Sequence, residues 1–190
     1  MNDTALWWPD LAAGPREAPV DEQAHVARVL QVSGLREGGT VFTLSRVEQL
    51  LLWSARRWRH GRFRWDQVEV EFRHLIPGGW ADALIAWEEA MEQLHLYPSG
   101  RPDIGNGCRS TLSLDERALL TLVGVLQRGR KARLSAALLL AHLMPPARRG
   151  DLAGPLLALA GTLSLAGLEL PLRSGSSPAE TDISVRSANS

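Results

Sequence analysis

Residues 43–61 read TLSRVEQLLLWSARRWRHG, and residues 111–129 read TLSLDERALLTLVGVLQRG. The likeness runs without a gap from residues 43–77 to residues 111–145, with eleven identities in 35 aligned positions. Unrelated segments of ordinary composition would share only about two or three. The shared residues include helix-starting and helix-ending types as well as leucine. We therefore infer an internal duplication of the chain.

Each copy opens with the same signal for the start of a helix. Ser45 and Glu48 form the pattern of a capping box, in which a hydroxyl and a carboxylate satisfy free amides of the first turn. Residues 113–116 repeat that pattern in the second copy. Apolar residues then recur at helical spacing until Gly61 in one copy and Gly129 in the other. We expect a helix to end at each glycine.

Two further helices are expected in each copy. Asp66 and Ser135 are short polar residues of the kind that caps the second helix. Pro77 and Pro145 end it, because the residue before a proline avoids helical backbone angles. A third helix follows, over about residues 80–97 in the first copy and from about Asp151 in the second.

The sequence therefore predicts an all-α fold, in which two tandem three-helix repeats pack with pseudo-twofold symmetry into one helical domain. The remaining segments are an arm with one short helix and a Ser-rich tail too poor in apolar residues to order itself. The expected spans are residues 1–41 for the arm, 42–171 for the helical domain, with repeats at 43–98 and 111–171, and 172–190 for a disordered tail.

Composition is that of an ordinary globular chain. It has 190 residues, 45% of them hydrophobic, and a formal net charge of zero, so one core can form without a metal or disulfide staple. Cys108 is the only cysteine, which indicates a reducing compartment. The first residues lack the basic-then-apolar order of a signal peptide, so we expect a cytoplasmic protein. Glycines and a proline interrupt the uncharged stretch 152–168, which favours a buried helix over a membrane span.

The second and third helices of the second repeat are Leu and Ala on nearly every side. A helix that is apolar all round must be covered all round, by a shared core or by a partner. We therefore expect a noncatalytic adaptor or regulatory protein that binds another protein or its own copy. Aromatic side chains supply much of the binding energy at such interfaces when they are exposed. The candidate anchors are Trp7, Trp8, Trp58 and Trp65, although each could equally be a core residue.

An alternative function is nonspecific nucleic-acid binding. Basic residues gather at 56–65 and at the matching turn 128–133. Two basic turns could bracket a phosphate backbone, but cations also collect at helix C-termini to offset the helix dipole. Zero net charge gives little long-range attraction to nucleic acid. The candidate residues are Arg57, Arg62, Arg64, Arg130 and Arg133.

A second alternative is an enzyme or metal-binding protein whose site is assembled by the fold. Two Glu-x-x-His pairs, Glu71/His74 and Glu92/His95, have the spacing of carboxylate-bridged metal sites. They should lie about 15 to 20 Å apart, because their helices are expected to run antiparallel. No nucleophile has a base at motif spacing, and no glycine run could cradle a phosphate. We therefore expect no catalytic residue, metal site or cofactor.

Overall fold

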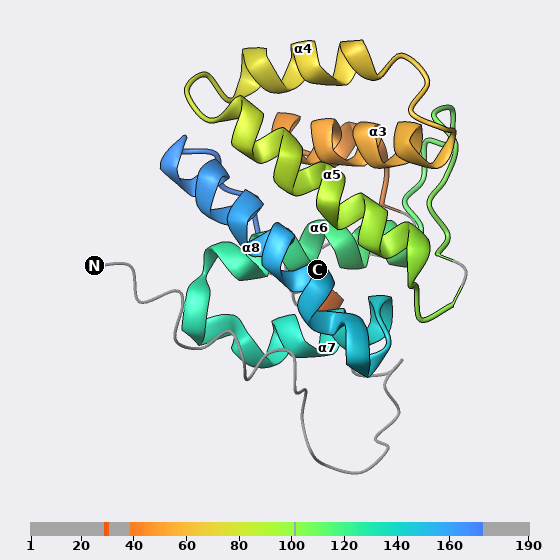
Figure 1. Ribbon diagram of the computed structural model, residues 1–190, viewed down its shortest axis with the longest axis vertical. Coiled ribbons are helices and arrows are strands. Elements are labelled where there is room, and N and C mark those ends of the chain that lie inside the picture. Colours follow the sequence, from red (N-terminus) through yellow and green to blue (C-terminus); the bar gives the residue numbers. More distant parts are fainter. Residues whose placement is uncertain (1–28, 31–38, 101, 173–190) are drawn as a thin grey trace, which may run out of the picture.

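The computed structural model describes residues 29–30, 39–100 and 102–172, and every extended regular element in this part is a helix (Figure 1). The all-α prediction is confirmed there. Residues 1–28 and 31–38 of the predicted arm, and residues 173–190 of the predicted tail, lie outside the described residues. The long helices are α3 (Arg46–Arg59), α4 (Trp65–Leu75), α5 (Trp80–Leu96), α6 (Leu114–Gln127), α7 (Arg133–Leu143) and α8 (Arg149–Leu165). The short 3-10 turns are η2 (Val41–Thr43), η3 (Gly129–Ala132) and η4 (Pro146–Arg148).

Both predicted capping boxes are confirmed. Ser45 accepts a hydrogen bond from the Glu48 amide and donates its own amide to the Glu48 carboxylate. Ser113 and Glu116 make the same reciprocal pair at the start of α6. These bonds satisfy amides that the first turn of a helix leaves without intrahelical partners.

The predicted caps at Asp66 and Ser135 are wrong. Helix α4 is entered from Arg64, and α7 from Ala132, and neither start has a side-chain cap. At α4 the turn itself supplies the bonds, because the Trp65 amide donates to the Arg62 carbonyl at 3.0 Å. The helix therefore begins before Asp66, which lies in its first turn.

Helices α5 and α8 form the most extensive helix pair among the described residues. They run antiparallel, since Gly79 at the start of α5 faces Thr162 near the end of α8, and Arg148 stacks on Tyr97 at the other end. The indole of Trp87, fully buried in α5, donates to the Ser54 hydroxyl of α3 at 2.7 Å. One continuous cluster of buried side chains runs through α3 to α8.

This core buries most of the apolar surface of α8. Leu152, Leu156, Leu159 and Leu163 are fully buried, and Leu165 is 89% exposed at the helix end. Within the described chain, none of the helices combines the length and apolar character needed to cross a bilayer.

Candidate functional site

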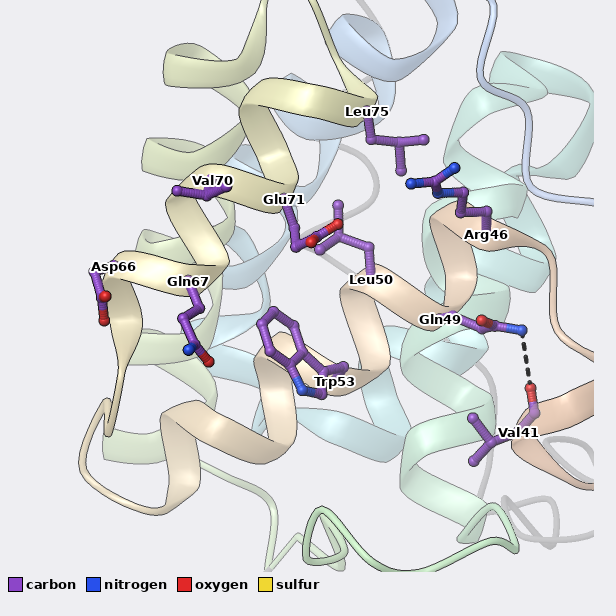
Figure 2. A pocket seen from close by; sticks show the side chains of 10 residues that line it. All are labelled: Val41, Arg46, Gln49, Leu50, Trp53, Asp66, Gln67, Val70, Glu71 and Leu75. Carbon is purple, nitrogen blue, oxygen red and sulfur yellow. Dashed lines mark hydrogen bonds between the residues drawn. The ribbon is translucent and has the colours of Figure 1, made fainter.

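A groove of about 600 Å³ lies between α3 and α4 (Figure 2). We call it the α3–α4 groove. Residues of both helices and of η2 line it: Val41, Arg46, Gln49, Leu50, Trp53, Asp66, Gln67, Val70, Glu71 and Leu75. Its volume is in the range of ligand and peptide pockets, which run to about 1,000 Å³.

The helical repeat explains why these residues share one groove. On α3, the lining side chains recur at spacings of three and four residues, and those of α4 do the same, so each helix presents one stripe. Val41 lies at the end of the groove near the start of α3, where the Gln49 side-chain amide donates to its carbonyl at 3.4 Å. The Arg57 guanidinium lies 4.3 Å from the Trp53 ring centroid and stacks on it. This contact fixes the largest aromatic side chain of the groove.

The two walls differ in charge. Asp66 and Glu71 stand on the α4 wall, and Arg46 stands on the α3 wall. In Figure 2, the side chains of Glu71 and Arg46 point into the space between the helices. Among the described residues, these three rim charges have no ion-pair partner.

The structure brings two of the four predicted tryptophan anchors together. The ring centroids of Trp58 and Trp65 lie 5.3 Å apart with an interplanar angle of 74°. Both rings are half-buried at the edge of the core, and Arg62 stacks against them. Trp7 and Trp8 lie outside the described residues.

The structure does not bring the two basic turns together. In Figure 1, the turn between α3 and α4 lies at the right edge of the molecule, and the turn between α6 and α7 lies at the left. Arg57 and Arg62 stack on tryptophans of their own chain. Arg64 is the residue from which α4 is entered, whereas Arg130 and Arg133 lie at the turn between α6 and α7.

Among the described histidines, His142 has a carboxylate partner. His142 Nε2 lies 2.8 Å from Asp115 Oδ1, beside a pocket of about 290 Å³ that Ser99 also lines. Burial raises the pKa of the Asp115 carboxyl, but hydrogen bonds from His142 and the Asp103 amide, with the charge of His142, outweigh burial and lower the pKa below its usual value. The Ser99 hydroxyl donates to the Ala141 carbonyl at 3.5 Å.

The predicted Glu-x-x-His pairs do not assemble into a larger cluster. Over the described ranges, no three His, Cys, Asp or Glu side chains come close enough to hold a metal ion. His74, at the end of α4, is exposed.

No family model matches this sequence, and comparison with curated proteins and with solved structures gave no match either.

Sequence reasoning missed the α3–α4 groove. It singled out Trp58 and Trp65 as aromatic side chains able to anchor an interface, and it passed over Trp53 and Val70. A signal was present on α4, where Val70 stands between Glu69 and Glu71 and off the apolar stripe of Val68 and Phe72. Val70 is 45% exposed, and it forms part of a contact surface only because the fold places it in one groove with Leu50 and Trp53.

Proposed function

We propose that this chain is a cytoplasmic, noncatalytic adaptor whose α3–α4 groove binds an amphipathic helix of another protein. The observation that carries the proposal is the groove itself, with apolar side chains between two helix walls and charged side chains on its rims. Grooves between paired helices receive helical ligands through anchors at every third or fourth position.

Trp53 is the expected centre of binding energy. Its ring is partly buried and held by Arg57, so little side-chain freedom is lost when a ligand covers it. Leu50 and Val70 flank the same space from the two walls. An apolar ligand residue placed here would remove water from Trp53 and Val70 and pack against the buried Leu50, which is the environment of interface hot spots.

The rim charges define the chemistry of the partner. Because Asp66 and Glu71 carry carboxylates, we expect Lys or Arg on the side of the ligand that faces α4. Because Arg46 is positively charged, we expect Asp or Glu on the side of the ligand that faces α3. Such pairs contribute mainly to specificity and to the rate of association, because they lie at a solvated rim.

A selection with a defined probe tests this function. A phage-displayed library of amphipathic helices is selected on the wild-type protein, and selected peptides are measured against Val70→Glu and Ile85→Glu variants. Ile85 is a matched control, since it is an aliphatic residue of α5 that is 56% exposed and does not line the groove. We expect peptides that bind wild type and Ile85→Glu equally and lose at least about tenfold on Val70→Glu. The absence of selected peptides, or equal binding to Val70→Glu, would contradict the proposal.

We also propose that α3–α5 and α6–α8 derive from one duplicated three-helix unit and pack with pseudo-twofold symmetry. The bounds of α6 and α7 follow those of α3 and α4 at the same offset as the aligned sequences. Gly61 and Gly129 both have positive φ, 77° and 63°, after the first helix of each unit. A twofold axis perpendicular to two equivalent helices makes them antiparallel, as α5 and α8 are. An experimental structure in which residues 46–96 and 114–165 fail to superimpose helix for helix would refute this.

A further inference from the structure

Three side chains surround the guanidinium of Arg62. Its central carbon lies 3.9 Å from the Trp58 ring centroid and 5.7 Å from that of Trp65. A guanidinium nitrogen lies 3.3 Å from a Glu88 carboxylate oxygen. The other Glu88 oxygen accepts a hydrogen bond from the Trp65 indole. We call Trp58, Trp65 and Glu88 the cation corner.

This arrangement differs from the other arginine stacks of the described chain. Arg57, Arg73 and Arg148 each cover one aromatic ring, at 4.3 to 4.5 Å. Arg62 alone among them lies against two rings, and those rings stand at 74° to each other. Two steeply inclined aromatic walls with a carboxylate beside them are the elements from which proteins build cation sites, because each ring face and the carboxylate attract positive charge.

The backbone angle φ of Arg62 is unfavourable for a residue with a side chain. Its φ is 60°, and that of Arg64 is 57°, in the left-handed region that residues with a side chain rarely adopt. Despite its contacts with the two rings and Glu88, the Arg62 side chain remains 48% exposed. Arg62 therefore reaches the cation corner from a turn with an unfavourable backbone angle, and about half of its side chain faces solvent.

We propose that the cation corner is a binding site for a guanidinium group supplied by another molecule, and that Arg62 is its internal competitor. A planar guanidinium stacks on a ring while its N–H groups reach a carboxylate at the edge, which is how Arg62 lies. The site is independent of the α3–α4 groove, because none of its three residues lines that groove.

Removing the competitor tests the proposal. Arg62→Gly empties the corner and suits the observed φ, because glycine adopts left-handed angles freely. Arg62→Asn, a second residue that tolerates such angles, repeats the experiment if the glycine variant is poorly folded. Arg64→Gly is the matched control, since it removes the same charge and relieves the same backbone strain but leaves Arg62 in place.

The probes are N-acetyl-L-argininamide and free L-arginine, titrated while the indole N–H resonances of Trp58 and Trp65 are followed by NMR. We expect saturable shifts in Arg62→Gly with an affinity at least about twofold above that of wild type and Arg64→Gly, because a tethered group at millimolar effective concentration weakens a probe of millimolar affinity by about that factor. Tighter binding of the capped compound would indicate an arginine side chain of a protein, and tighter binding of L-arginine would indicate the free amino acid.

Adding Glu88→Gln to Arg62→Gly removes the charge while an amide oxygen can still accept from Trp65. We expect this double variant to bind the preferred probe at least about fivefold more weakly. Equal affinities for Arg62→Gly and Arg64→Gly, no saturable shift in Arg62→Gly, or full binding by the double variant would each overturn the proposal.

Discussion

Arg56 of α3 and Glu116 of α6 form a buried ion pair, with 2.7 Å between Arg56 Nε and Glu116 Oε1 and side-chain exposures of 4% and 0%. The pair is fully hydrogen-bonded. Arg56 also donates to the carbonyls of Arg109 and Thr111, and Glu116 accepts from the amides of Gly105 and Ser113. One contact therefore joins two helices and the loop that precedes the second.

Breaking this pair should be strongly destabilising. Arg56→Met leaves the Glu116 charge buried without its cation, and Glu116→Gln leaves the guanidinium without its anion. We expect either variant to lose about 3 to 5 kcal/mol of unfolding free energy in urea denaturation. A loss below about 1 kcal/mol in both would show that water reaches the pair.

The two helix-capping serines should differ in their contribution to stability. Ser45 and Ser113 each accept from a backbone amide, but the Ser113 hydroxyl also donates to the Asp103 carbonyl. Ser45→Ala should cost about 1 kcal/mol. Ser113→Ala should cost about 2 kcal/mol, because it also removes a bond to the loop. The exposed Ser164→Ala variant is the control, expected within about 0.5 kcal/mol of wild type in the same denaturation assay. Equal losses at the two caps would contradict the added bond.

The close approach of α5 to α8 gives a double-mutant test. A Cβ atom added at Gly79 would lie 2.7 Å from Cγ2 of Thr162. Gly79→Ala should therefore cost about 1 to 3 kcal/mol in thermal or urea unfolding. Thr162→Ser removes that methyl group and keeps the hydroxyl that donates to the Ala158 carbonyl. We expect the double variant to regain at least half of the loss, whereas strictly additive effects would mean that the two positions do not touch.

Stability at acid pH should depend on Asp115. Its pKa is lower in the folded protein than in the unfolded chain, so its contribution is present above the unfolded pKa and is lost as pH falls through the folded one. Between about pH 5 and pH 2, wild type should lose more unfolding free energy than Asp115→Asn. Asp82→Asn, the same change at an exposed position of α5, should leave the wild-type slope unchanged. If Asp115→Asn and wild type lose unfolding free energy equally as pH falls, the bond between Asp115 and His142 does not stabilise the folded protein.

The helices were predictable because their signals are local. Ser45 with Glu48, and Gly61 after the last apolar position, mark the ends of α3 within a few residues of chain. The starts of α4 and α7 were not predictable, because they depend on how the preceding turn closes. The burial of Arg56 was equally hidden, since its partner Glu116 lies in another helix.

The α3–α4 groove depends on an even longer-range property, the angle at which two helices diverge from their connecting turn. The helical pattern assigns Leu50 to an apolar stripe, but it does not reveal that Val70 and Glu71 face the same space. No local pattern encodes that relation, because it is set by the packing of α3 and α4 on α5.

The most direct test of the adaptor proposal is a charge reversal across the groove. The dissociation constant of a selected peptide is measured with wild type and with Glu71→Lys, and then with a peptide in which the basic residue facing Glu71 is replaced by glutamate. We expect Glu71→Lys to weaken the original peptide at least about tenfold and the altered peptide to recover most of that loss. The same dissociation constant for both proteins with either peptide would contradict binding in the α3–α4 groove.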